Sequence, residues 1–109
     1  MKNLVIIPTY NEIENIHPQI EKILKTPAVS ILVVDDGSPD GTGELVDLLG
    51  MKNPGRVFCL HREKKNGLGK AYLAGFAWGL SQGFDNLIQM DADGSHDHTR
   101  LPVMIDVGI

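Results

Sequence analysis

The sequence predicts an α/β fold built on a doubly wound, mainly parallel sheet. Four short segments read as strands, at residues 4–7, 30–34, 57–60 and 86–90. The first three are rich in β-branched residues and lack polar alternation, which is typical of strands covered on both faces. Segments with helical periodicity separate the strands. Strands that alternate with helices imply right-handed crossovers and therefore a parallel sheet.

Two helices are predicted from apolar residues at helical spacing. The first covers residues 15–25, and Pro18 is tolerated there if it falls in the first turn. The second covers residues 42–49. The residues expected to face inward are Ile16, Ile20, Ile23 and Leu24 in the first helix and Leu45, Val46, Leu48 and Leu49 in the second.

A third helix is predicted over residues 70–82, and residues 101–105 read as the first turns of a fourth. Gly75 and Gly79 lie one turn apart in the third helix. They lower helix propensity but would let this helix approach the sheet closely. Trp78 on the same helix is expected in the core.

Length and composition bound the class of protein. The chain has 109 residues, 42% hydrophobic and 22% charged, which fits one soluble domain. The net charge of −4 and the lack of a basic stripe argue against nucleic-acid binding. The single cysteine, Cys59, excludes an intrachain disulfide framework and fits a reduced, cytoplasmic setting. No apolar run approaches the length of a signal peptide or a membrane span.

Polar and glycine-rich loops follow all four predicted strands. They cover residues 8–12, 35–42, 62–69 and 91–98. In parallel α/β sheets, ligands bind outside the carboxyl ends of the strands. These loops are therefore expected to form one site, and the connections at the opposite end carry less obvious chemistry.

The loop after the fourth strand carries a pair of carboxylates. Asp91 and Asp93 are separated by Ala92, so on an extended chain both carboxylates point to the same side. Two such groups repel unless a cation lies between them, and oxygen ligands suit Mg²⁺ or Mn²⁺. The alternative is that they are ordinary loop residues, with Asp91 capping the next helix.

The loop after the second strand has two interpretations. Asp35 and Asp36 either cap the second helix or bind ribose hydroxyls and base N–H groups. Residues 36–47 also have the ligand spacing of an EF-hand loop. A strand rather than a helix precedes them, so this assignment is rejected.

The basic and histidine residues near these loops are ambiguous. Lys64, Lys65 and Lys70 either flank a glycine turn or face a diphosphate. His96 and His98, beside the acidic pair, are either solvated or touch metal or phosphate. The four histidines form no i, i+4 pair on a predicted helix and have no cysteine partner, so no zinc site is predicted.

Four ordered motifs after successive strands closely resemble those of the family 2 glycosyltransferases. They read P-T-Y-N-E, V-V-D-D-G-S-P-D-G-T, K-K-N-G-L-G-K-A-Y-L-A-G-F and M-D-A-D-G-S-H-D. Within the family, the dolichol-phosphate (polyprenol monophosphate) mannosyltransferases are most similar, and the resemblance runs from Leu4 to about Pro102. It implies a GT-A fold with Rossmann-like alternation, of which residues 1–109 are the nucleotide-sugar-binding part.

The resemblance also assigns roles to single positions. It implies that the nucleotide-sugar contacts Pro8, Tyr10 and Glu12 in the first loop, and Val34 and Asp36 at the end of the second strand.

In the fourth loop, the resemblance makes Asp91 and Asp93 the catalytic pair. They would hold Mg²⁺ or Mn²⁺ on the sugar-nucleotide diphosphate, with the Ala92 backbone nearby. Ser95 lies where some relatives offer another metal ligand, and His98 stands where the family usually has proline.

The implied reaction is transfer of a sugar, most readily mannose from GDP-mannose, to a polyprenol (dolichyl) phosphate with inversion. The cation would neutralise charge on the leaving nucleoside diphosphate. The acceptor phosphate is already largely anionic at neutral pH, so no general base is required. UDP-glucose and related donors remain open. Alternative functions are a non-catalytic nucleotide-binding or assembly module, and a phosphohydrolase that uses the D-x-D pair.

Members of the family continue well past the D-x-D pair, so the chain is expected to be an incomplete domain. We expect it to bind donor with weak or no turnover. An uncovered sheet edge would favour a homo-oligomer. In a full-length protein, the resemblance implies a peripheral position at the cytoplasmic face of a membrane.

Overall fold

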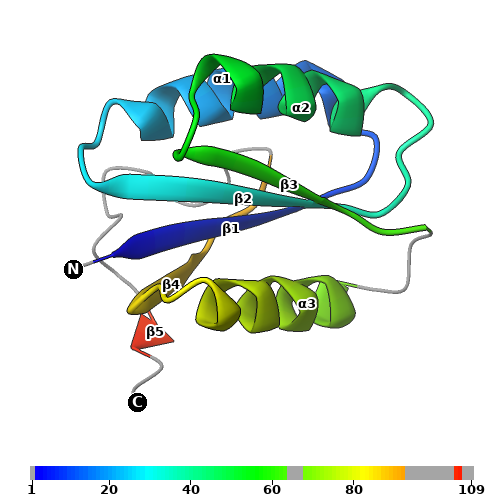
Figure 1. Ribbon diagram of the computed structural model, residues 1–109. Coiled ribbons are helices and arrows are strands. Elements are labelled where there is room, and N and C mark those ends of the chain that lie inside the picture. The colour runs from blue at the N-terminus through cyan, green and yellow to red at the C-terminus, as the bar shows by residue number, and fades with distance from the viewer. Residues whose placement is uncertain (1, 64–67, 93–104, 107–109) are drawn as a thin grey trace.

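The computed structural model describes residues 2–63, 68–92 and 105–106. Helices and strands alternate along the chain, as the sequence predicts (Figure 1). Their order is β1 (Asn3–Thr9), α1 (Ile13–Leu24), β2 (Val29–Asp35), α2 (Thr42–Lys52), β3 (Val57–His61), α3 (Leu68–Ser81), β4 (Asn86–Gln89) and β5 (Ile105–Asp106).

The strands form one sheet in the order β3-β2-β1-β4-β5. The first four strands of this order are parallel, and β5 runs antiparallel to β4. The chain therefore builds outward from β1 to β2 and β3, and then returns to place β4 on the other side of β1. This reversal between β1 and β4 is a topological switch point, where open α/β sheets bind their ligands.

Both faces of the sheet are covered by helices. α1 and α2 lie on one face and α3 on the other (Figure 1). Val5 and Ile7 of β1 pack into the cluster under α1 and α2, whereas Leu4 and Ile6 pack into the cluster under α3. Because each face of β1 meets a helix, the strand needs apolar residues at successive positions, which explains the lack of polar alternation.

The close approach of α3 to the sheet is confirmed. A methyl group at Gly75 would lie 2.6 Å from the Cγ2 of Ile6, and one at Gly79 would lie 2.7 Å from the Cδ2 of Leu87. Trp78 is half-buried and packs against the same cluster, with its ring stacked on Phe84. The two glycines therefore lower the helix propensity of α3 but allow it to pack directly against the strands.

Two details of the helix predictions are wrong. α1 begins at Ile13, so Pro18 lies in its second turn, where its ring removes one hydrogen bond of the helix. Leu48 was expected to face inward but is 56% exposed, while the neighbouring Leu49 is buried. α2 covers only the outer part of the sheet, so it buries a narrow stripe of residues.

The C-terminal prediction is also corrected. Ile105 lies in β5 and pairs with Leu87 of β4, rather than in a helix. Residues 101–104 of that predicted helix lie outside the described residues. Pairing with β5 satisfies main-chain hydrogen-bonding groups on the outer edge of β4. From the sequence, a sheet edge was expected to be uncovered.

Candidate functional site

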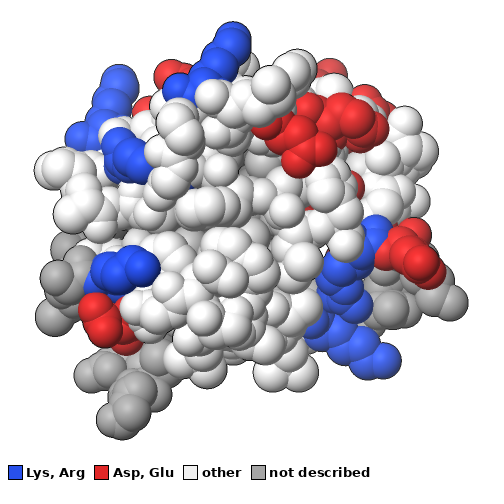
Figure 2. Space-filling model, in the orientation of Figure 1, with Lys and Arg blue, Asp and Glu red and all other residues white. Residues whose placement is uncertain are grey.

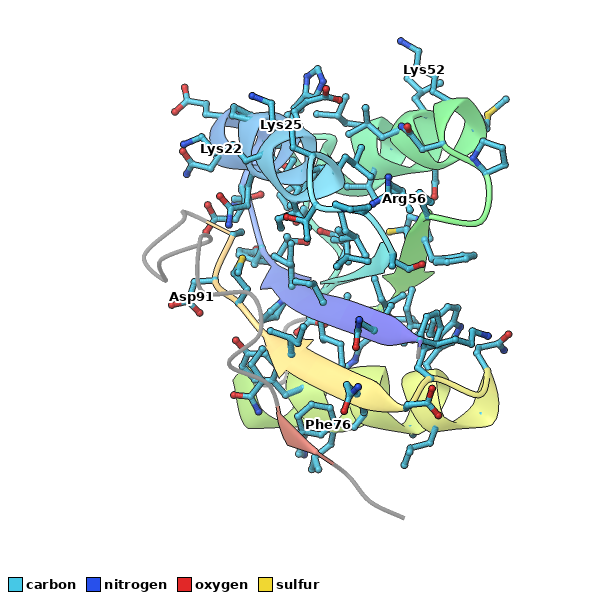
Figure 3. The ribbon with its side chains drawn as sticks, turned by 90° about the vertical axis from the view of Figure 1, so that its left-hand side faces the viewer. Lys22, Lys25, Lys52, Arg56, Phe76 and Asp91 are labelled. Carbon is cyan, nitrogen blue, oxygen red and sulfur yellow. The ribbon has the colours of Figure 1, made fainter. Side chains whose placement is uncertain are left out.

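The carboxyl ends of the parallel strands meet at one rim of the sheet. Thr9, the last residue of β1, stands opposite Asp35 of β2, and Asp35 stands opposite His61 of β3. Asp91 follows the carboxyl end of β4 (Figure 3). The loops that the sequence predicted to form one site therefore leave the sheet on the same side.

Asp35 forms the structural centre of this rim. Its carboxylate accepts hydrogen bonds from the Thr9 hydroxyl at 2.6 Å, from the Ser38 hydroxyl at 2.6 Å and from the Ser38 N–H at 3.1 Å. The side chain is only 3% exposed. Asp35 thus ties the end of β1 to the loop after β2, and its oxygens are occupied by the protein itself.

Asp36 has a different environment. It is 5% exposed, and its Oδ1 lies 3.4 Å from the Nη1 of Arg62. Within the described residues, neither of these two atoms has a hydrogen-bond partner. A buried ion pair is stable only when its remaining polar capacity is satisfied, so this pair has capacity for a polar ligand.

The helix-capping role considered for Asp35 and Asp36 belongs to Asp40. Its carboxylate accepts hydrogen bonds from the Ile13 N–H at the start of α1, and from the Thr42 N–H and hydroxyl at the start of α2. Desolvation acts to raise the pKa of the exposed Asp40, but these hydrogen bonds outweigh it and lower the pKa. Asp40 therefore holds the two helix starts together.

The first loop is attached to the second by main-chain donors. The Asn11 N–H donates to the Ser38 hydroxyl at 2.9 Å, and the Glu12 N–H donates to the Thr42 hydroxyl at 3.1 Å. Tyr10 of this loop is 39% exposed. Its side chain is thus accessible to a ligand beside the rim.

The other predicted nucleotide contacts differ in accessibility. Pro8 is half-buried, and Val34 is fully buried in the cluster under α3. Val34 is 0% exposed in side chain and main chain together, so no part of it reaches the surface, and its predicted contact stays a prediction.

Asp91 is half-buried beside α3. The Tyr72 hydroxyl donates a long hydrogen bond of 3.4 Å to the Asp91 Oδ1. Burial, reinforced by the negative charge of Asp91, raises the pKa of Tyr72 to about 12. The phenol is therefore protonated at neutral pH and acts as a donor to this carboxylate. Ala92 is buried beyond it.

Several predicted residues lie outside the described part of the chain. They are Lys64, Lys65, Asp93, Ser95, His96 and His98. The pairing of Asp91 with Asp93 stays a prediction. Sequence reasoning missed the partners Arg62, Thr9 and Tyr72. Thr9 and Tyr72 lie within the first and third motifs, and Arg62 opens the third loop, so their positions were the signal that could have indicated them.

Residues 4–107 match the family described as Glycosyl transferase family 2. The chain belongs to this family. Its resemblance to the family is thereby confirmed, from the first strand to β5.

Two relatives are similar to this chain over nearly its whole length. The chain is 55% identical over 106 residues to a polyprenol monophosphomannose synthase of Mycolicibacterium smegmatis, covering 96% of this chain and 40% of that protein. It is 50% identical over 107 residues to an undecaprenyl-phosphate mannosyltransferase of Micrococcus luteus, covering 97% of this chain and 44% of that protein. The chain thus spans less than half the length of these relatives.

Solved structures confirm the fold class. The mannosyltransferase PcManGT from Pyrobaculum calidifontis, in complex with GDP-Man and Mn²⁺, superposes with a TM-score of 0.75 at 24% identity, covering 84% of this chain and 27% of that one. S. aureus TarS superposes with a TM-score of 0.68 at 26% identity, covering 85% of this chain and 17% of that one. The fold is that of the GT-A glycosyltransferases.

The length and the apolar character of a helix determine whether it can cross a membrane. In the described ranges, no helix combines the length and the apolar character that crossing a bilayer requires.

Proposed function

We propose that this protein is a glycosyltransferase that transfers mannose from GDP-mannose to a polyprenol phosphate, assisted by a divalent cation. The proposal is supported by its family and by two relatives named as polyprenol-phosphate mannosyl enzymes. A structural neighbour binds GDP-Man and Mn²⁺. The observation that carries the proposal is the position of Asp36 and Asp91 on either side of the switch point.

The spacing of these carboxylates suits a nucleotide sugar. Asp36 follows β2 and Asp91 follows β4, with β1 between the two strands. Adjacent strands lie about 4.8 Å apart, so the two positions are separated by roughly 10 Å across the sheet. A nucleoside bound at β2 can therefore extend its diphosphate across β1 to β4.

The residues near β2 are suited to orient the nucleoside. Asp36 can accept hydrogen bonds from a ribose or base, and Arg62 fixes its position through the ion pair at 3.4 Å. Tyr10 is exposed beside the same rim, where it can contact the base. Pro8 and Glu12 complete the proposed contacts of the first loop, and Val34 is the proposed contact near the end of β2.

The residues after β4 are suited to a metal-bound diphosphate. Asp91 and Asp93 would hold Mg²⁺ or Mn²⁺, because carboxylate oxygens are the ligands these hard cations prefer. When bound, the cation would neutralise negative charge on the leaving diphosphate. Tyr72 positions the Asp91 carboxylate through its hydroxyl.

The acceptor end of the reaction needs no base from this chain. A phosphate monoester has a second pKa near 6 and is already a nucleophile at neutral pH. The chain therefore contributes donor binding, and we expect weak or no turnover from it alone.

Calorimetric titration of GDP and UDP into the purified chain tests the donor site. We expect GDP to bind in the presence of Mn²⁺ and to bind at least about tenfold more weakly in chelator, a difference of ~1.4 kcal/mol. Asp91→Asn and Asp93→Asn should each reproduce the chelator result. Glu21→Gln, which alters an exposed carboxylate on α1, is the matched control and should bind as the wild type does.

The other outcomes discriminate between proposals. A preference for UDP would contradict the mannosyl donor and indicate another branch of the family. A folded chain that binds neither nucleotide would refute the donor site. Efficient mannosyl transfer to a polyprenol phosphate by this chain alone would refute the expectation of weak turnover.

A further inference from the structure

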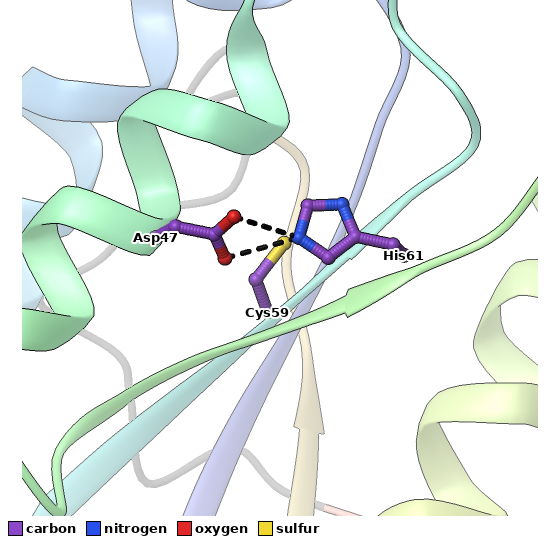
Figure 4. A group of neighbouring side chains, drawn as sticks. All are labelled: Asp47, Cys59 and His61. Atoms are coloured by element: carbon purple, nitrogen blue, oxygen red, sulfur yellow. Dashed lines mark hydrogen bonds and ion pairs between the residues drawn. The ribbon is translucent and has the colours of Figure 1, made fainter.

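Three side chains from α2 and β3 converge on one side of the sheet (Figure 4). Cys59 and His61 are two residues apart on β3, so their side chains point to the same face of the sheet. Asp47 reaches them from α2. One ligand atom from each residue lies within 4.8 Å of the others. We propose that Asp47, Cys59 and His61 bind a divalent cation of borderline softness, Zn²⁺ first, at a site separate from the D-x-D pair.

The donor set determines the choice of metal. It combines a thiol sulfur, an imidazole nitrogen and a carboxylate oxygen, all of which are ligands of Zn²⁺. Mg²⁺ and Ca²⁺ prefer oxygen ligands alone, so sulfur and nitrogen disfavour them. Three protein ligands leave the fourth tetrahedral position open to water or to another ligand.

The distances are close to those a metal requires. The His61 Nε2 already lies 3.0 Å from both Asp47 oxygens. Ligand atoms around tetrahedral Zn²⁺ are separated by roughly 3.3–3.6 Å. No two of these atoms are more than 4.8 Å apart, so the ligand atoms need to approach one another by at most roughly 1.5 Å. The side chains of His61 and Asp47 are 49% and 52% exposed, so small rotations can supply it.

The surroundings favour a cation. Figure 2 shows acidic side chains gathered over α2, the helix that carries Glu44 and Asp47. Burial, and then the charges of Asp47, Asp35 and Glu44, raise the pKa of the Cys59 thiol to about 12. The same negative charges attract a metal ion, which takes the place of the thiol proton when it binds.

The packing of α2 also makes room for the imidazole ring. A methyl group at Gly43 would lie 2.8 Å from the Cε1 of His61. Glycine at this position lets the ring lie against the start of α2, with its Nε2 toward Asp47. A metal bound there would fix the sheet's outer strand to α2. It would also stiffen the chain at His61, next to the Arg62 that pairs with Asp36.

Cobalt titration followed by absorption spectroscopy tests the site directly. Co²⁺ replaces Zn²⁺ in tetrahedral sites and produces thiolate-to-metal charge-transfer absorption, which oxygen-only ligands such as the D-x-D pair cannot produce. We expect one Co²⁺ per chain to give this absorption, and excess Zn²⁺ to abolish it. An Asp91→Asn/Asp93→Asn variant should give the same absorption.

Single substitutions test each ligand. Cys59→Ser should abolish the charge-transfer band, and His61→Gln and Asp47→Asn should each weaken Co²⁺ binding by at least about tenfold, the loss typical of even an outer-shell partner. His17→Gln is the matched control, because His17 and Glu21 form a comparable exposed pair at 3.5 Å with no thiol beside it. Circular dichroism confirms that each variant is folded.

Two results would overturn the proposal. One is a folded wild-type chain that shows no thiolate band at saturating Co²⁺. The other is a band that keeps wild-type affinity after either the Asp47 or the His61 substitution, because the metal would then be held by a different set of ligands.

Discussion

The two ends of the sheet use arginine in opposite ways. At the amino end, the Arg56 guanidinium donates hydrogen bonds of 2.7–3.2 Å to the main-chain carbonyls of Leu24, Thr26 and Val29 (Figure 3). At the carboxyl end, the Arg62 guanidinium lies 3.4 Å from Asp36. Its Nη1 has no hydrogen bond among the described residues. Arg56 is therefore fully used by the fold, whereas Arg62 keeps a buried donor that no described residue accepts from.

The same distinction separates two adjacent aspartates. Among the described residues, Asp35 accepts three hydrogen bonds from Thr9 and Ser38, while Asp36 forms one ion pair, with Arg62. Burial alone does not distinguish the two, since both are almost fully buried. A buried polar group whose hydrogen-bonding capacity is filled by the protein supports the fold. A buried polar group with unused hydrogen-bonding capacity is the better candidate for binding a ligand.

The largest effect is expected at Asp35. In Asp35→Ala, two hydroxyls and one N–H lose their acceptor inside the protein, and we expect the free energy of unfolding to fall by about 3 kcal/mol. Urea denaturation followed by circular dichroism measures this loss. Glu44→Ala, an exposed carboxylate on α2, is the control. A loss below about 1 kcal/mol would show that the Asp35 network does not hold the rim together.

The next effect is expected at the amino end. Arg56→Met keeps the length of the side chain but removes every guanidinium donor, leaving the three carbonyls to water. We expect the free energy of unfolding to fall by about 2 kcal/mol, with metal-dependent GDP affinity unchanged. Weaker GDP binding by a folded Arg56→Met chain would break the distinction between the two ends.

Arg62→Met is the matched substitution at the carboxyl end. Removing the Arg62 guanidinium leaves Asp36 without its ion-pair partner, so the Asp36 carboxylate is no longer held in position. We expect metal-dependent GDP affinity to fall about tenfold, equal to ~1.4 kcal/mol. Calorimetry measures the affinity, and denaturation measures stability in parallel. Unchanged GDP affinity would show that the Asp36–Arg62 pair is purely structural.

The smallest effect is expected for Tyr72→Phe. The hydrogen bond to Asp91 is long, at 3.4 Å, so its loss should cost less than about 1 kcal/mol. The pKa of Tyr72 is raised to about 12 in the folded chain. Its contribution to stability is therefore complete below the usual tyrosine pKa near 10, and it is lost as the pH rises through about 12.

Absorbance titration of the phenolate checks this assignment. The wild-type chain should show an ionisation near pH 12 that is absent from Tyr72→Phe. If the step near pH 12 persists in the variant, the raised pKa belongs to another group.

Local pattern was enough to predict the architecture. Apolar strands without alternation predicted a sheet covered on both faces, and the polar loops after them predicted one binding rim. Gly75 and Gly79 predicted the close approach of α3. The errors at Pro18 and Leu48 have a common source, because helix periodicity does not fix where a helix starts or how wide a stripe the sheet covers.

The pairing of side chains was decided only by the tertiary structure. The residues next to Asp35 and Asp36 in the sequence do not show which of the two supports the fold. Their partners Thr9 and Arg62 come from distant parts of the chain. Cys59, His61 and Asp47 carried no zinc spacing along the chain, yet strand alternation and the packing of α2 on β3 bring them together. Sequence periodicity encodes which face a residue occupies, whereas strand order and register determine which residues meet there.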